Sequence, residues 1–160
     1  MPKLMMFESL IHPVDVSRFY FGDVSRVFAT TRKRNPLIAG EDRAVLVLTH
    51  HAPVDGIVEG QRYLTPEPPG PAMGHSLIEG EQGRMVALAN GDVLLNGQIV
   101  WRNTHPEGYK GDSVKATQEH FIACLRSGAE FETSARRYLG SFATVEAAYT
   151  SALEQRAVEV

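Results

Sequence analysis

Three residues near the N-terminus have the types and spacing of an acid–base site. Glu8 lies four residues before His12, and Asp15 lies three residues after it. On a continuous helix, residues three and four positions apart are neighbours on one face. A carboxylate beside a histidine fixes the tautomer of the imidazole and raises its basicity, as general acid–base catalysis requires. The spacing therefore makes His12 a candidate catalytic base, with Glu8 and Asp15 as acidic partners.

The same triple also fits a purely structural role. A helix with Glu8 in its first turn and His12 as a partly buried packing residue would show the same spacing, and spacing alone favours this interpretation. The remaining histidines have neither zincin nor zinc-finger spacing, so we expect them to be exposed or hydrogen-bonded, and we expect no metal site. They are His50, His51, His75, His105 and His120.

Helix signals surround this triple and return in the last third of the chain. Residues 9–21 are predicted as a helix, because Pro13 is tolerated in a first turn and Gly22 can end the helix. The residues of this helix that share an apolar stripe with His12 are Val16, Phe19 and Tyr20. A later helix is expected to have Asp112 or Ser113 as its cap and to end at Gly128.

A last helix is predicted to begin near Ser134. Its apolar positions recur at three or four residues, as expected for a helix packed on a sheet. They are Tyr138, Phe142, Val145, Tyr149 and Leu153.

Strand signals fill the middle of the chain. Alternating or apolar runs at 24–34, 43–50 and, more weakly, 56–65 predict strands, and the proline-rich residues 66–74 predict a loop. Residues 75–102 predict an antiparallel meander, because their two Asn-Gly pairs favour type I′ turns. The final residues 158–160 could add an edge strand.

The order helix, strands, two helices predicts an α+β fold in a single domain over residues 1–160. We expect an open, predominantly antiparallel β-sheet with helices packed on one face. If helices cover one face, some apolar strand residues must lie on the other, and an apolar outer face is typical of an interface. We therefore expect a homo-oligomer formed face to face through the sheet. The strand residues concerned are Val27, Val45, Val47, Val86 and Leu88.

The composition excludes several classes of function. The 16 basic and 19 acidic residues give a formal charge of −3, which offers no basic surface for nucleic acid or an anionic membrane. No apolar run reaches the about 18 residues of a membrane span. The one cysteine fits a reducing compartment, so we expect a cytoplasmic protein.

Three segments together resemble the Gfo/Idh/MocA oxidoreductases. Residues 8–24 resemble the family's active-site helix: an acid, three residues, His, two residues, Asp, a hydrophobic residue, and later Arg and Gly. Residues 78–85 resemble its G-x-x-G hairpin, and residues 119–158 resemble its C-terminal helices and final strand. The order and spacing of these matches cover nearly the whole chain, which is similar to the family's C-terminal domain.

The resemblance implies a specific chemistry. The family joins a Rossmann domain that binds NAD or NADP to a C-terminal α/β domain that supplies the substrate pocket. Its members transfer hydride to or from small molecules, typically sugars, polyols and related hydroxy or keto compounds. By this resemblance, His12 matches the catalytic histidine that moves the substrate hydroxyl proton. Asp15 matches a supporting acid, and Glu8 sits where many members have Asp.

Departures from the family pattern leave two hypotheses. The chain lacks the Rossmann domain and has no G-x-G-x-x-G turn, so we expect no cofactor-binding residues and no NAD or NADP bound to this chain alone. One hypothesis is the substrate-binding, catalytic-histidine domain of a longer NAD(P)-dependent oxidoreductase, inactive by itself. The other is a stand-alone, non-catalytic ligand-binding or oligomerisation module derived from that family.

Overall fold

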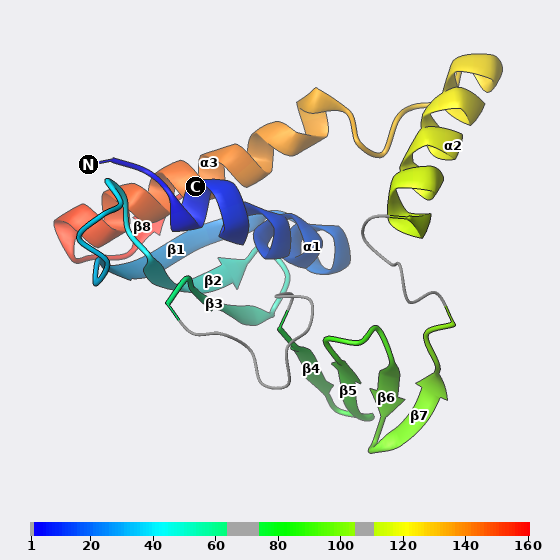
Figure 1. Ribbon diagram of the computed structural model, residues 1–160, viewed down its shortest axis with the longest axis horizontal. Helices are drawn as coiled ribbons and strands as arrows, with labels where there is room; N and C mark the ends of the chain where they lie inside the picture. The colour runs from blue at the N-terminus through cyan, green and yellow to red at the C-terminus, as the bar shows by residue number, and fades with distance from the viewer. Residues whose placement is uncertain (1, 64–73, 105–110) are drawn as a thin grey trace. The chain divides into compact units, whose positions relative to one another are not determined.

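The computed structural model describes residues 2–63, 74–104 and 111–160 and confirms the predicted α+β class (Figure 1). The helical elements are η1 (Met5–Leu10, a π-helix), α1 (Ile11–Phe21), α2 (Asp112–Ser127) and α3 (Ala135–Glu154). The strands are β1 (Val24–Arg32), β2 (Arg43–His50), β3 (Asp55–Gln61), β4 (Ser76–Gly80), β5 (Gly83–Ala87), β6 (Val93–Leu95), β7 (Gln98–Trp101) and β8 (Val158–Glu159).

The strands form two antiparallel sheets of four strands each, with orders β3-β2-β1-β8 and β4-β5-β6-β7. The chain divides into two compact units, one of Met1–Leu64 with Glu132–Val160 and one of Thr65–Phe131. The first sheet belongs to the first unit and the second sheet to the second. The expected β8 is present as an edge strand, where Val158 pairs with Val27.

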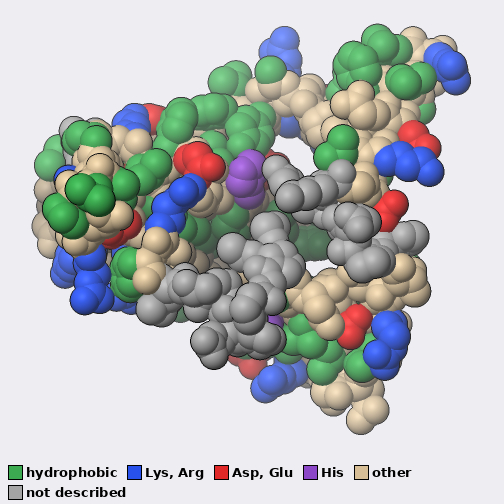
Figure 2. Space-filling view, viewed as in Figure 1, with side chains coloured by type: hydrophobic (Ala, Val, Ile, Leu, Met, Phe, Trp, Pro, Cys, Tyr) green, Lys and Arg blue, Asp and Glu red, His purple; other side chains and the backbone are tan. Residues whose placement is uncertain are grey.

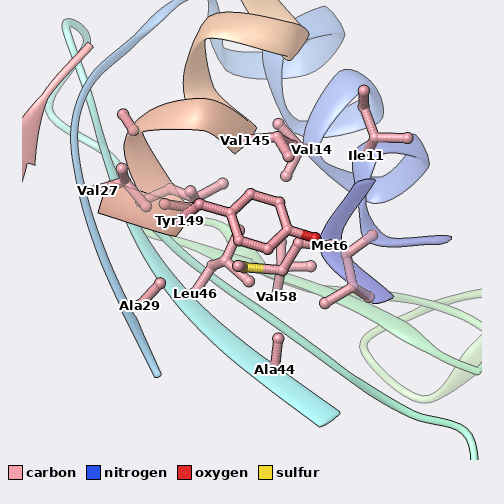
Figure 3. Packing of buried hydrophobic residues seen from close by; sticks show 14 of the residues in the cluster. Met6, Ile11, Val14, Val27, Ala29, Ala44, Leu46, Val58, Val145 and Tyr149 are labelled. Carbon is pink, nitrogen blue, oxygen red and sulfur yellow. The ribbon is translucent and has the colours of Figure 1, made fainter. Parts of the chain in front are cut away.

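In the first unit, η1, α1 and α3 cover one face of the sheet (Figure 1). Small and branched side chains on β1, β2 and β3 point to this face and are buried, because alternate residues of a strand face the same side. Figure 3 shows them packed against residues from all three helical elements. The labelled core residues are Met6, Ile11, Val14, Val27, Ala29, Ala44, Leu46, Val58, Val145 and Tyr149.

The opposite face of this sheet carries a row of exposed apolar residues. Phe28 on β1 is paired with Val47 on β2, and Val47 is paired with Ile57 on β3. All three side chains are exposed, Ile57 to 75%. Val47 therefore lies on the outer face as expected, whereas Val27 is buried on the helix-covered face.

The N-terminal helix differs from the predicted 9–21 in its start and in its buried side. Residues Met5–Leu10 form a π-helix, and α1 begins only at Ile11. Gly22 ends α1 as expected, with φ +81° and its N–H donating to the carbonyl of Arg18 at 2.9 Å. The helix packs through Ile11 and Val14, so the predicted stripe does not face the core. Its members Val16, Phe19 and Tyr20 are exposed.

Helix α3 follows the prediction closely. Ser134 is its N-cap, and the Ser134 hydroxyl accepts a hydrogen bond from the backbone N–H of Arg137. Four of the five predicted apolar positions pack on the core, and the fifth, Leu153, is exposed because it lies in the last turn. Small buried residues on the same face let the helix approach the sheet closely; they are Ser141, Thr144, Ala148 and Ser151.

The second unit contains the predicted meander and α2. The two-residue turn of Asn96 and Gly97 joins β6 to β7, and both residues have positive φ as a type I′ turn requires. Gly128 ends α2 in the left-handed conformation, as expected. The expected cap was wrong: Gly111 is the N-cap, and Asp112 is already the first helical residue. The proline-rich segment 66–74 lies almost entirely outside the described residues.

Two strand ends also differ from the prediction. β1 stops at Arg32 rather than residue 34, because the backbone N–H groups of Arg34 and Asn35 turn to the carboxylate of Asp42. β3 stops at Gln61 rather than at residue 65. Of the predicted strand 56–65, residues 64 and 65 lie outside the described residues.

Candidate functional site

The candidate residues Glu8 and His12 are presented by a helical segment that a buried carboxylate holds in place. Glu41, only 4% exposed, accepts hydrogen bonds from the backbone N–H groups of Leu4 and Met6, at 3.1 and 3.0 Å to its nearer oxygens. These groups precede or begin η1, where helical N–H groups have no partner within the helix. Glu41 thus fixes the start of the π-helix that leads into α1.

The phenol of Tyr149 on α3 completes this arrangement. Its hydroxyl donates a hydrogen bond to Glu41 and accepts one from the backbone N–H of Leu4 at 3.1 Å. Burial raises the pKa of Tyr149 well above its ordinary value, and the negative charge of Glu41 raises it further. Tyr149 therefore remains a neutral donor, and it links the N-terminal segment to α3.

His12 lies in the first turn of α1 and is exposed, while its neighbours Ile11 and Val14 are buried. Figure 2 shows one face of the molecule, on which acidic, basic and histidine side chains are exposed among hydrophobic ones. Among the described residues, none forms a hydrogen bond with the His12 ring. The partly buried packing role considered above does not match the exposure of His12.

Glu8 lies on η1 and forms an ion pair with Arg62, just after β3. The Ser9 hydroxyl donates to the Glu8 carboxylate and accepts a hydrogen bond from Arg62 Nη2 at 2.6 Å. Arg62 is a partner of Glu8 that the sequence did not indicate. It lies within the predicted strand 56–65, and nothing in its local sequence connects it with a residue more than fifty positions earlier.

Asp15 is directed to α3 instead. Its carboxylate accepts a hydrogen bond from the Ser141 hydroxyl and lies 3.7 Å from Arg18 Nη1. Burial raises the pKa of the nearby Tyr138, and the negative charge of Asp15 adds to this shift. The structure therefore shows no hydrogen bond between Asp15 and His12, and it places the Asp15 carboxylate in a contact between helices.

Arg18 organises that contact. Its guanidinium donates to Ser141 Oγ at 2.8 Å and to the carbonyl of Arg137 at 3.1 Å, and it also binds the carboxylate of Asp23. Gly140 lies beneath the guanidinium, and a Cβ at this position would occupy the same space. The Arg18 guanidinium thus joins α1 to α3. The hydrogen bond between Asp15 and Ser141 adds a second polar contact between the same two helices.

His50 is a buried histidine whose two ring nitrogens both have hydrogen-bond partners. It is 3% exposed; its Nδ1 lies 2.8 Å from the carbonyl of Gly22 and its Nε2 lies 2.9 Å from Ser17 Oγ. Because a carbonyl only accepts, Nδ1 carries the proton and Nε2 accepts from the serine. His50 agrees with the expectation of a hydrogen-bonded histidine, while His105 lies outside the described residues.

Two further features of the described residues concern metal ligands and membrane-spanning helices. In these parts of the chain, no group of three or more His, Cys, Asp or Glu side chains is arranged to hold a metal ion. No described helix has the length and apolar character needed to cross a membrane.

Comparison with known proteins gives related sequences over nearly the full chain. A D-apiose dehydrogenase from Paraburkholderia graminis is 35% identical over 170 aligned positions, which cover 94% of this chain and 43% of that enzyme. A D-apiose dehydrogenase from Rhizobium rhizogenes is 33% identical, covering 94% of this chain and 47% of that enzyme. No protein-family profile matches the chain. The chain therefore spans less than half the length of these relatives.

A solved structure is similar to this chain in both sequence and fold. An oxidoreductase from Agrobacterium radiobacter, crystallised with NAD+, L-tartaric acid and magnesium, is 32% identical with a TM-score of 0.86. The match covers 98% of this chain and 49% of that one. These relatives confirm the resemblance that the three sequence segments predicted.

Proposed function

From the resemblance of this chain to the C-terminal domain of the Gfo/Idh/MocA oxidoreductases, we propose that it is the substrate-binding domain of an NAD(P)-dependent dehydrogenase. In this proposal both compact units belong to one functional domain, as the sequence predicts, and His12 is the catalytic base. The substrate is a sugar, polyol or related hydroxy compound. The observation that carries the proposal is the alignment of 94% of the chain with two D-apiose dehydrogenases at 33–35% identity.

The position of His12 supports its proposed role. Oxidation of an alcohol removes a hydride with its electron pair from carbon and a proton from oxygen, and leaves a carbonyl. An imidazole with an open ring nitrogen can take the hydroxyl proton, because its ordinary pKa is close to neutral pH. His12 is exposed on α1, which follows the π-helix whose start Glu41 fixes, so the ring can meet a substrate without rearrangement of the core.

The nicotinamide would supply the hydride acceptor, and we propose that a separate nucleotide-binding domain holds it. A dinucleotide's phosphates are usually bound by a glycine-rich turn between a strand and a helix N-terminus. The sequence contains no G-x-G-x-x-G turn, so the residues of this chain do not fit that group. We therefore assign to this chain only the steps that involve the substrate.

A chimera tests this proposal. Residues 1–160 replace the aligned region of the Paraburkholderia graminis D-apiose dehydrogenase, so that the remainder of that enzyme supplies the nucleotide-binding part. We expect the chimera to form NADH or NADPH with D-apiose or another sugar or polyol of a test panel. A folded chimera that binds nucleotide but oxidises none of these compounds would contradict the proposal and favour a non-catalytic binding module.

A further inference from the structure

The pair of Glu8 and Arg62 is held rigidly at its backbone and exposed at its charged ends. Glu41 fixes the start of η1, which carries Glu8. The backbone N–H of Arg62 donates to the carbonyl of Asp42 at 2.8 Å, which fixes Arg62 at the end of the sheet. The side chains of Glu8 and Arg62 are 61% and 41% exposed, so they retain hydrogen-bonding capacity towards a ligand.

The chemistry of this pair matches adjacent hydroxyl groups. An ionised carboxylate only accepts hydrogen bonds, and a guanidinium only donates them. A hydroxyl group does both, so each of two neighbouring hydroxyls can donate to Glu8 and accept from Arg62. The Ser9 hydroxyl, already bonded to both side chains, adds a third polar group at the same place. A neutral polyol can therefore satisfy every charged group of the pair.

A second exposed ion pair, on the first sheet, shows why the pair of Glu8 and Arg62 is different. Arg43 and Glu59 lie on neighbouring strands and have nearly the same exposure, 41% and 51%. Pairs of this kind usually contribute little to stability. Glu8 instead lies on the π-helix η1, four residues before His12, and Arg62 follows β3, so this pair joins the candidate helical segment to the sheet.

We propose that Arg62, together with Glu8, is a specificity-determining residue that binds two adjacent hydroxyl groups of a neutral sugar or polyol. This inference rests on the proposed function, and it narrows the substrate class. The two charges cancel, so the pair offers no net attraction for an anionic hydroxy acid. His12 follows Glu8 by four residues in the sequence and lies in the first turn of the adjoining helix α1.

Binding to the 160-residue chain tests this directly. Isothermal calorimetry compares D-apiose, myo-inositol and L-tartrate on the wild type and on the variants Arg62→Gln, Arg62→Lys and Glu8→Gln. We expect the neutral compounds to bind, and we expect Arg62→Gln and Glu8→Gln to weaken that binding about tenfold or more, as loss of a hydrogen bond to a charged group does. Arg62→Lys should retain part of the binding affinity, since lysine keeps the positive charge but lacks the planar, two-pronged set of donors of the guanidinium.

Arg43→Gln is the matched control, because it removes a similarly exposed ion pair that joins β2 and β3. It should leave binding unchanged within twofold, and thermal unfolding should show that all three glutamine variants are folded. If Arg62→Gln binds the neutral compounds like wild type, or if Arg43→Gln weakens binding equally, the proposal is overturned. Preferential binding of L-tartrate would overturn it as well.

The chimera separates this inference from the proposed function. In an active chimera, Arg62→Gln should raise KM for the sugar about tenfold with kcat changed less than threefold, and an unchanged KM would overturn only the role of Arg62. An inactive chimera whose 160-residue domain still binds sugars through Arg62 would overturn the dehydrogenase function and leave the hydroxyl site intact. Absence of both activity and sugar binding would overturn both.

Discussion

The hydroxyl of Ser141 on α3 donates a hydrogen bond to the carboxylate of Asp15 on α1. This contact gives Asp15 a partner that its spacing to His12 did not indicate. Arg18 donates to the same serine, so the carboxylate, the hydroxyl and the guanidinium form one network between the helices. Asp15 is therefore positioned to orient α1, and it can influence His12 only through the helix that carries both.

The network predicts coupling between Arg18 and Gly140. Alanine in the middle of a helix is ordinarily more stable than glycine by about 0.5–1 kcal/mol. At residue 140 the added Cβ would displace the Arg18 guanidinium from its partners. We expect Gly140→Ala to destabilise the wild type or leave it unchanged, and to stabilise the Arg18→Ala variant. Urea unfolding of the four proteins measures the coupling; additivity within about 0.5 kcal/mol would exclude it.

Replacement of His12 tests the catalytic assignment. In the active chimera we expect His12→Asn to lower kcat by about 10²–10⁴-fold, the usual contribution of a positioned acid–base group. The KM for nucleotide should change little, because the proposed nucleotide site lies outside this chain. His51→Asn, which alters an exposed histidine at the end of β2, is the control. Turnover of His12→Asn within a few-fold of wild type would show that His12 is not the base.

Asp42 predicts a specific dependence of stability on pH. Hydrogen bonds from the backbone N–H groups of Asn35 and Arg34 hold the pKa of this buried carboxyl below its ordinary 3.8. The unfolded chain therefore binds the proton more readily, so the stabilisation is complete above pH 3.8 and is lost as pH falls through the lower, folded pKa.

We expect Asp42→Asn to lower the melting temperature at neutral pH and to flatten its decline between roughly pH 5 and 2. Calorimetric melting across this range measures both effects. Asp55→Asn, which neutralises an exposed carboxylate at the start of β3, serves as control. A variant whose melting temperature falls with acid as steeply as that of the wild type would contradict the assignment.

The row of Phe28, Val47 and Ile57 predicts assembly through the open face of the first sheet. Contiguous apolar surface on a sheet is typical of an interface, and the register aligns these three residues across three strands. We expect light scattering to give a dimer or larger species, and Ile57→Lys to shift it towards monomer. Leu37→Lys, which alters a 91% exposed residue outside the sheet, should have no effect. A wild-type monomer at all concentrations would refute the prediction.

Local signals in the sequence were sufficient for much of the fold. β2 has its predicted bounds, and Gly22, Gly128 and Ser134 end or begin helices as their backbone preferences indicate. The Asn96-Gly97 turn fixes the register of its hairpin because only a few residue types adopt positive φ readily. Each of these features depends on interactions within a few residues of the chain.

The site could be predicted only in part, because its contacts join residues far apart in the sequence. The acid, histidine and acid spacing predicted Asp15 as a partner of His12, whereas the structure shows the Asp15 carboxylate hydrogen-bonded to Ser141. It also missed Arg62, whose partner Glu8 lies on a different element. The π-helix escaped prediction too, since its start depends on the buried Glu41 and not on its own residues.

The consecutive residues Glu41 and Asp42 hydrogen-bond to three segments that are separate in the sequence. We therefore expect these segments to unfold locally as one unit. Their oxygens bind the amide groups of Leu4, Met6, Arg34, Asn35 and Arg62. None of these amides can exchange its hydrogen with solvent while the dipeptide keeps its place at the start of β2. Their exchange rates should therefore rise together when that turn unfolds locally, although the segments that carry them are separate in sequence.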